Sequence, residues 1–135
     1  NIHRYLRNLE EVIIRVLKIY GIDGGRREKF PGVWVEGRKV ASIGIGVRDW
    51  ISLHGFALNI NSDLSYFSLI RPCGFDGKIV TSIRHILRRP IDITGARHHL
   101  IENFGEVFNL RMEKDGKEIS GLDGKEIASR FFWQE

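Results

Sequence analysis

The sequence predicts an α+β fold in which a mainly antiparallel sheet is flanked by helices. Three features predict it: an amphipathic helix at residues 2–20, a β-hairpin followed by a third strand over residues 33–60, and shorter helical segments after residue 60. The chain has 135 residues, of which 42% are hydrophobic and 28% charged. That length and composition fit one domain with one hydrophobic core.

The first element is the clearest helix of the chain. Its apolar residues recur at steps of three and four, the period of a helix with one buried face. They are Ile2, Tyr5, Leu6, Leu9, Val12, Ile13, Val16, Leu17 and Tyr20. Gly21 is expected to end this helix. Residues 21–32 contain four glycines and a proline and are predicted to form a loop.

A β-hairpin is predicted next, with its turn at residues 36–38. Strict alternation divides its second arm into two faces. One face carries Lys39, Ala41, Ile43, Ile45 and Val47, and the other carries Val40, Ser42, Gly44 and Gly46. The second face has few side-chain atoms, so backbone or a ligand can approach it closely. A third strand follows at residues 50–60, in which Gly55 marks a bulge or another close approach.

The second half of the chain reads as short helices joined by turns. Ser62 is a suitable cap for a short helix, and Pro90 is expected to end another at residues 82–89. Thr94 is expected to cap a third helix. The apolar stripe of that helix is Leu100, Ile101, Phe104, Val107 and Phe108. The segment "DGKEI" occurs twice in the tail, and both copies are interpreted as turns.

Charge and composition limit the possible partners and compartments. The net charge is +4, with 15 Lys and Arg against 8 Asp and Glu (+7) in residues 1–90, and 6 against 9 (−3) beyond. The basic part suits an acidic protein, a nucleic acid, or simply a solvated surface. No nucleic-acid signature accompanies the charge, and no apolar run approaches the roughly 20 residues of a membrane span. One cysteine forms no internal disulfide, which favours a reducing compartment.

Four polar residues are candidates for chemistry: Lys39, Ser42, His54 and Cys73. Three of them have a structural alternative. Cys73, in "RPCGF", is a nucleophile if a base or positive charge favours its thiolate, and otherwise a small buried residue. Lys39 is either a general acid and base or a strand-end lysine that reaches water. His54 is either a partner for the thiol or a structural histidine. No metal-ligand spacing, Walker-type loop or dinucleotide motif occurs, so we expect no metal or nucleotide cofactor.

Four motifs in register carry a resemblance. "PGVWVEGRKVASIG", "HGFALNI", "PCG" and "VTSI" resemble, in order and spacing, the lipoyl(octanoyl) transferase family, lipoate-biosynthesis protein B. The match runs from about Ile2 to Ile83, with 34 residues separating Lys39 from Cys73. The resemblance implies a mixed sheet flanked by helices, as in biotin-protein and lipoate-protein ligases. It assigns residues 1–109 to the catalytic domain and leaves residues 110–135 as a tail of unassigned role.

The resemblance also implies a reaction and a site. Family members move an octanoyl (or lipoyl) group from acyl carrier protein to a lysine of lipoyl domains, in 2-oxoacid dehydrogenases and in the glycine cleavage H protein. Cys73 is then the acyl-thioester nucleophile, and Lys39 activates it. The acyl-substrate site comprises Ser42, Ile43, Gly44, His54, Gly55, Phe56 and Ala57. A cytoplasmic or organellar location follows, with no nucleic acid or membrane as partner.

Two departures from the family pattern keep an alternative open. The family carries an upstream Arg-Gly-Gly segment and a His-Gly-Pro-Gly-Gln stretch, and this chain matches neither. The chain also starts inside a helix without Met, so we expect it to be part of a longer domain. The alternative is a non-catalytic relative or fragment that only binds an acidic carrier or a partner protein.

Overall fold

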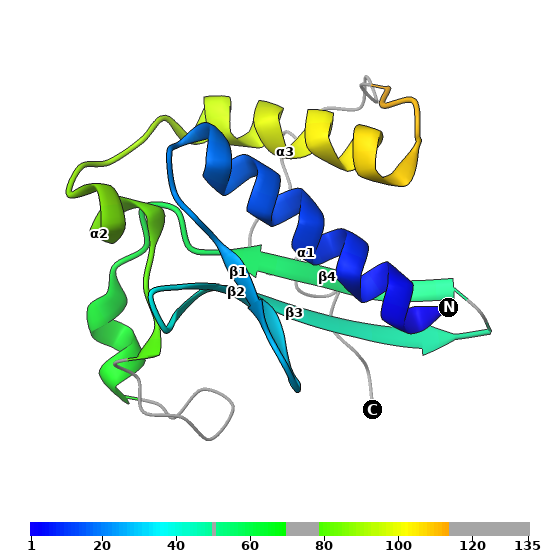
Figure 1. The fold of residues 1–135 in the computed structure, drawn as a ribbon, viewed down its shortest axis with the longest axis horizontal. Coiled ribbons are helices and arrows are strands. Elements are labelled where there is room, and N and C mark those ends of the chain that lie inside the picture. Colours follow the sequence, from blue (N-terminus) through cyan, green and yellow to red (C-terminus); the bar gives the residue numbers. More distant parts are fainter. Residues whose placement is uncertain (50, 70–78, 114–135) are drawn as a thin grey trace, which may run out of the picture.

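The computed structural model describes residues 1–49, 51–69 and 79–113, and of His54 only the backbone. Its elements follow the order α1 (Ile2–Ile19), β1 (Gly25–Arg27), β2 (Phe30–Val35), β3 (Arg38–Arg48), β4 (Ile51–Leu58), the 3-10 helix η1 (Leu64–Leu69), α2 (Ile83–Leu87) and α3 (Ile93–Phe108). The strands form one antiparallel sheet in the order β1-β2-β3-β4 (Figure 1). A single parallel bridge joins Lys39 to Val80. The predicted α+β class is confirmed.

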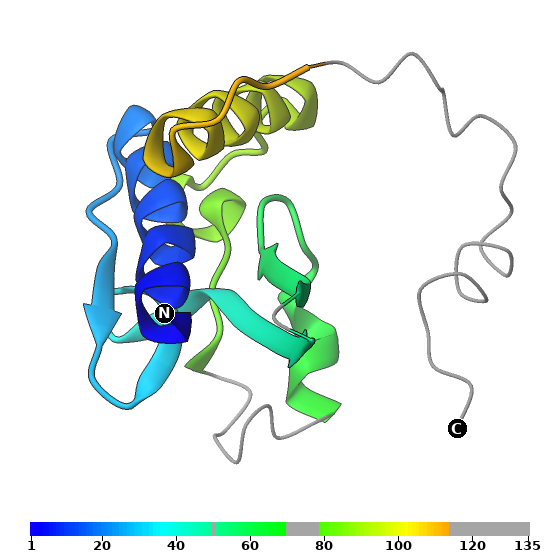
Figure 2. The same cartoon turned by 90° about the vertical axis from the view of Figure 1, so that its right-hand side faces the viewer.

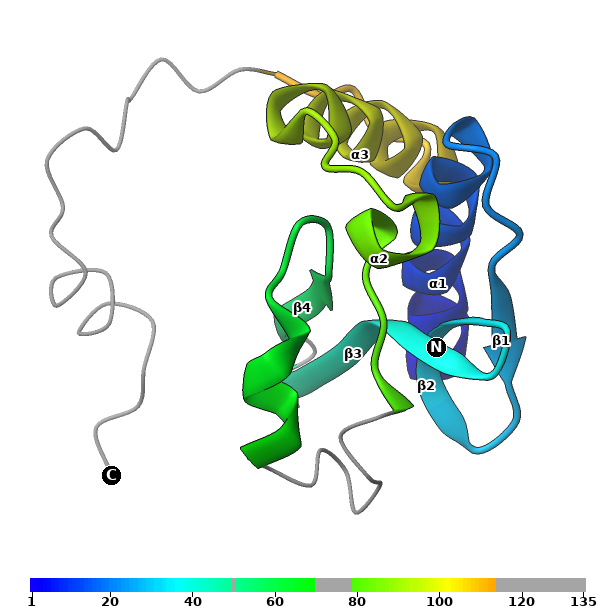
Figure 3. The ribbon, with the colours of Figure 1, turned by 90° about the vertical axis from the view of Figure 1, so that its left-hand side faces the viewer.

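The core lies between the helices and one face of this sheet. In Figure 3 the three α-helices lie on the same side of β2 and β3. The buried cluster combines residues of the helices and of the sheet. It contains Ile13 and Leu17 from α1, Val33, Val35, Val40 and Ala41 from β2 and β3, Ile83 from α2, Ala96 from α3, and Ile91 from the segment between α2 and α3. Within the described ranges no helix is long and apolar enough to cross a membrane.

Helix α1 confirms the periodic pattern of residues 2–20. Its buried apolar side chains are Leu9, Val12, Ile13, Val16 and Leu17, all on one face. Gly21 follows the helix with a φ of +73°, a conformation that glycine adopts without steric cost. Helix α3 packs beside α1, as Figures 1 and 2 show, with the Phe108 ring 5.6 Å from the Tyr5 ring. The two helices therefore run antiparallel.

The loop predicted over residues 21–32 is wrong in part. Residues 25–27 form β1, and β2 already begins at Phe30. Because glycines favour loops, the sequence pattern did not predict this strand. Tertiary ion pairs with α1 stabilise it: the Arg26 guanidinium lies 3.1 Å from the Glu10 carboxylate and 2.6 Å from that of Glu11.

Three local predictions are also corrected. Asp63, not Ser62, caps η1, because its Oδ1 accepts from the Ser65 amide at 2.9 Å. Asp92, not Thr94, caps α3 and accepts from two amides of its first turn. Each aspartate stands two or three positions before the residue whose amide donates to it, which is the spacing of an N-cap. No bulge occurs at Gly55, since the β3–β4 register runs without interruption through the Gly44–Gly55 pair.

Candidate functional site

A β-bulge decides the position of Lys39. Trp34 pairs with Lys39 and Val33 pairs with Ala41, so Val40 is an extra residue on β3. Val40 and Ala41 are consequently both buried in the core, although they are adjacent. The prediction that Lys39 shares a face with Ala41 and Ile43 is therefore wrong. Lys39 lies on the opposite face, which is the face of Trp34, Gly32 and Ser42.

Two neighbours define the path of the Lys39 side chain. Its Cε lies so close to Gly32 that a Cβ there would stand 2.6 Å from it and 2.5 Å from the Ala41 carbonyl oxygen. Gly32 also has a φ of +135°, which side-chain-bearing residues rarely adopt. The Lys39 ammonium then lies 5.6 Å from the centre of the Trp34 ring. That distance is typical of a cation–π contact.

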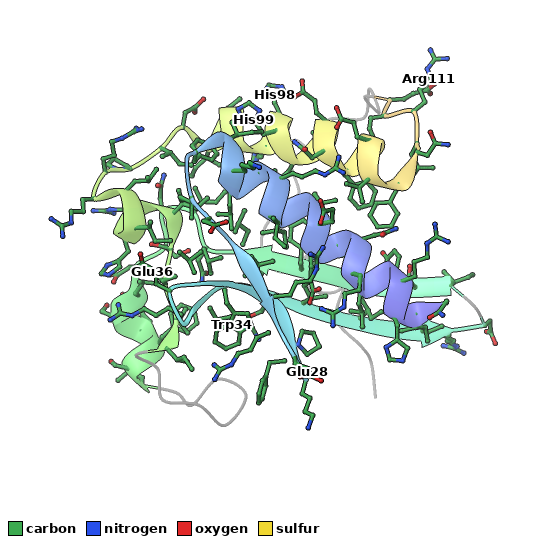
Figure 4. The ribbon with its side chains drawn as sticks, in the orientation of Figure 1. Glu28, Trp34, Glu36, His98, His99 and Arg111 are labelled. Atoms are coloured by element: carbon green, nitrogen blue, oxygen red, sulfur yellow. The ribbon has the colours of Figure 1, made fainter. Side chains whose placement is uncertain are left out.

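The Trp34 ring contacts a second cation. The Arg27 guanidinium lies 5.0 Å from its centre, and the same guanidinium lies 5.5 Å from the Phe30 ring. Figure 4 labels Trp34 on the sheet beside β2 and β3. The indole is itself nearly buried, with 6% of its surface exposed. A rigid aromatic surface therefore borders the ammonium of Lys39.

A buried carboxylate holds the strand that carries Gly32. Glu10 on α1 is only 2% exposed, and its Oε1 accepts from the Gly32 amide at 3.2 Å. Its Oε2 binds Arg7 at 2.8 Å and Arg26 at 3.1 Å. A buried charge is tolerated only when it is paired and hydrogen-bonded, and here it is both. Glu10 thus connects the first helix to the backbone beneath Lys39.

The neighbouring Glu11 extends this cluster toward solvent. The hydrogen bond from Arg26, and next that from Arg15, hold the pKa of the Glu11 carboxyl below its usual value. The Arg26 guanidinium donates to Glu11 at 2.6 Å and the Arg15 guanidinium at 3.1 Å. About a third of the Glu11 side chain is exposed, so these ion pairs are screened more than those of Glu10.

The face that carries Lys39 continues across β3 and β4 as a surface with few side-chain atoms. Ser42 pairs with Ala57, and Gly44 pairs with Gly55. Among the described residues, no atom lies within 4 Å of a Cβ added at Gly44 or at Gly55, so this part of the chain leaves the space above both open. The predicted bare face is confirmed for Ser42 and Gly44, and Gly55 and Ala57 extend it.

Two other predicted substrate residues lie on the opposite face of the same strands. Ile43 pairs with Phe56, and both pack against the core cluster. The backbone of His54 pairs with that of Ile45 in the register. The predicted set is therefore contiguous in the sheet, but its side chains divide between the open face and the core face.

Cys73 lies outside the described residues. The chain resumes at residue 79, and Val80 forms the parallel bridge with Lys39. The amide of Thr81 donates to the Lys39 carbonyl oxygen at 2.9 Å. Val80, seven positions after Cys73 in the sequence, thus pairs with the backbone of Lys39.

Asn59 and Thr81 are structural residues whose roles the sequence reasoning missed, although both stand in the quoted motifs. The Asn59 amide donates to the carbonyl of Val40, the bulge residue, at 3.0 Å. Its side chain donates to the Thr81 carbonyl at 3.2 Å, and its own carbonyl accepts from the Ile83 amide at 2.9 Å. The sequence signal for these roles was an asparagine at the end of the strand motif and, later in the chain, the Thr-Ser pair of "VTSI", which the structure shows to be buried. These bonds hold residues 80–83 against the bulge.

The family model described as the lipoyl protein ligase A/B catalytic domain matches residues 1–105. An octanoyltransferase of Caldanaerobacter subterraneus subsp. tengcongensis is 46% identical over 114 residues, which cover 84% of this chain and 50% of that relative. An octanoyltransferase of Nostoc sp. is 49% identical over 112 residues, covering 83% and 50%. The chain therefore spans about half the length of the curated relatives it matches.

Solved structures share the fold. A crystal structure of lipoate-protein ligase A bound with ATP superposes with a TM-score of 0.70 at 18% identity, covering 95% of this chain and 53% of that one. A bipartite lipoate protein ligase from Thermoplasma acidophilum gives 0.68 at 19% identity, covering 95% and 52%. At this identity the likeness concerns the fold alone.

Proposed function

Because this chain belongs to the lipoyl protein ligase A/B catalytic domain family, we propose that it forms the Lys39-bearing part of an octanoyltransferase. The reaction moves an octanoyl group from an acyl carrier protein to a lysine of a lipoyl domain. Residues 1–109 form a portion of the catalytic domain that carries this activity. The observation that carries the proposal is the placement of Lys39, on the open face of the sheet and bridged to the segment that follows Cys73.

In the first step the sulfur of Cys73 attacks the thioester carbonyl of the octanoyl carrier. A new thioester forms on Cys73, and the carrier thiol leaves. Lys39 accepts the proton of the Cys73 thiol and returns a proton to the departing sulfur. One thioester replaces another of similar energy, so the step needs no ATP.

In the second step the amine of the target lysine attacks the acyl-Cys73 carbonyl. An amide forms, the Cys73 sulfur leaves, and Lys39 assists the transfer of the amine proton. An amide is more stable than a thioester, so this step is downhill. The contacts with Trp34 and Gly32 support the assignment, since they limit the conformations of the Lys39 side chain.

The open surface of Ser42, Gly44, Gly55 and Ala57 is proposed to receive the octanoyl chain. These positions present at most one or two side-chain atoms, and the described residues leave the space above the two glycines free. A flexible acyl chain requires a surface of this kind, along which it lies against backbone and methyl groups. Ile43 and Phe56 support that surface from the core side.

The direct test is the mass of the intact protein after incubation with octanoyl-acyl carrier protein. We expect one octanoyl unit, absent in Cys73→Ser and strongly slowed in Lys39→Met. The same measurement is made on this chain preceded by the upstream segment of the family. An adduct on neither protein, or an adduct that survives Cys73→Ser, contradicts the proposal. Binding of the carrier without an adduct identifies the non-catalytic alternative.

A further inference from the structure

A basic pocket lies between the turn that joins β2 to β3 and helix α2. Its volume is about 780 Å³. Its lining residues are Val35, Glu36, Arg38, Thr81, Arg84, His85, Ile86 and Arg88. Figure 4 labels Glu36 at that turn, next to α2. The pocket is separate from the open face described above, since it contains none of the residues of that face.

Positive charge dominates this pocket. Three arginines and one histidine line it, against the single carboxylate of Glu36. The Arg38 guanidinium lies 3.5 Å from Nε2 of the His85 ring, within hydrogen-bonding distance, at the start of β3. The three guanidinium groups give this part of the surface an excess of positive charge.

The arginines of this pocket differ from those around Glu10 and Glu11. Arg7, Arg15 and Arg26 all form ion pairs with Glu10 or Glu11. Across residues 1–49, 51–69 and 79–113 there is no such ion pair for the pocket arginines.

Arg84 has a weak influence on one acidic neighbour. Its charge is the last cause, after hydrogen bonds from Ser65, of the lowered pKa of Asp63. That carboxylate does not line the pocket. Within the part of the chain that the structure describes, no carboxylate pairs with these guanidinium groups, which suits them to an external anion.

The lining indicates a protein surface as the partner. Small-molecule pockets of this size are lined mainly by apolar side chains. Here only Val35 and Ile86 are apolar, and the guanidinium groups come from the start of β3 (Arg38), from α2 (Arg84) and from the C-cap of α2 (Arg88). Such a distribution matches several carboxylates on one acidic surface better than a single compact anion.

The pocket also adjoins the backbone of Lys39. Arg38 immediately precedes Lys39, and Thr81, which lines the pocket, donates its amide to the Lys39 carbonyl at 2.9 Å. We propose that this basic pocket is the docking site for an acidic carrier protein that delivers the acyl thioester to the Lys39 face. The inference rests on the proposed function for the identity of the cargo.

The test compares two octanoyl donors that differ only in the carrier protein. Octanoyl-acyl carrier protein presents the acidic surface, and octanoyl-pantetheine lacks it. We expect Arg84→Glu to raise the KM for the carrier-borne donor about tenfold or more, and Arg38→Glu to act similarly. The KM and kcat for octanoyl-pantetheine remain within about twofold of wild type. Arg4→Glu, an equal charge change at an exposed position of α1, serves as the matched control and leaves both donors unaffected.

Salt provides a second readout. The KM of the wild type for the carrier-borne donor rises with ionic strength, and the Arg84→Glu variant loses most of this dependence. Equal losses with both donors indicate a structural defect and overturn the proposal, as does an unchanged KM for the carrier-borne donor.

Direct binding separates this inference from the proposed reaction. If neither donor acylates the wild type, the reaction is refuted, and fluorescence anisotropy of labelled acyl carrier protein still tests docking. Binding that Arg84→Glu weakens and Arg4→Glu preserves supports the pocket. Binding that both variants preserve, or no binding at all, overturns it.

Discussion

The ammonium of Lys39 lies 5.6 Å from the centre of the Trp34 ring, and the two residues are direct partners across β2 and β3. Their pairing depends on the bulge at Val40, because without the extra residue Lys39 would share a face with the core residue Ala41. The Lys39 side chain then passes through the space beside Gly32, which has no side chain, and ends next to the Trp34 ring.

Replacement of Trp34 should separate positioning from stability. A cation–π contact contributes about 0.5–2 kcal/mol, so Trp34→Leu is expected to lower the rate of Cys73 acylation by roughly twofold to thirtyfold, mainly in kcat. Trp34→Phe retains an aromatic face and should preserve most of the rate. Both variants lose buried area, so thermal unfolding monitored by circular dichroism provides the control. Equal rates in the two variants would contradict a role for the ring in positioning Lys39.

Gly32 and Gly44 form a matched pair for testing close approach. Gly32→Ala places a Cβ 2.5 Å from the Ala41 carbonyl oxygen at a φ of +135°, and should lower the free energy of unfolding by about 2–4 kcal/mol. Gly44→Ala meets no atom of residues 1–49, 51–69 and 79–113 within 4 Å and should change the free energy of unfolding by less than about 1 kcal/mol. Urea denaturation measures both. Similar values for the two variants would show that the contact beneath Lys39 is not restrictive.

Bulk at the open face should affect substrate binding rather than folding. Gly55→Leu places a side chain in the open space above β4, where we propose that the octanoyl chain lies. The KM for octanoyl donors should rise at least tenfold, while the melting temperature stays within a few degrees of wild type. A donor with a two-carbon acyl group is the control, since its KM should change little. An equal KM increase for both donors would place the acyl chain elsewhere.

Glu10 should matter far more to stability than its neighbour Glu11. Glu10→Leu removes the acceptor of the Gly32 amide and the partner of two arginines, at an expected cost of about 3–5 kcal/mol in the free energy of unfolding. Glu10→Gln keeps an acceptor and should lose less, about 1–2 kcal/mol. Glu11→Gln, at a partly exposed position, should cost under about 1 kcal/mol. Chemical denaturation at pH 7 gives all three values, and a Glu10→Leu loss no larger than that of Glu11→Gln would refute the structural role of Glu10.

The charge of Glu11 should make a pH-dependent contribution. Arg26 and Arg15 hold its pKa in the folded protein below the usual value of 4.5. A carboxyl whose folded pKa is lowered stabilises the protein above its unfolded pKa, and this contribution is lost as the pH falls through the folded pKa. The difference in unfolding free energy between wild type and Glu11→Gln should therefore be constant from pH 7 to about pH 5 and shrink below pH 4.5. A difference that grows on acidification would contradict this sign.

The sequence by itself determined the elements whose signal is local. The period of residues 2–20 fixed α1, because a helix with one buried face repeats every 3.6 residues. The turn at residues 36–38 and the alternation beyond Ala41 fixed the hairpin and the bare face of Ser42 and Gly44. The four motifs in register identified the family, which the comparisons confirm.

Only the tertiary structure decided which face of the sheet presents Lys39. A bulge has no sequence pattern of its own here: it exists because the Asn59 amide binds the carbonyl of Val40 and the Thr81 amide binds that of Lys39. The role of Glu10 is equally non-local, since its partners Arg26 and Gly32 stand 16 and 22 residues further along the chain. Hydrogen bonds between distant segments thus set the direction of the lysine, whereas side-chain periodicity set only the strand on which it lies.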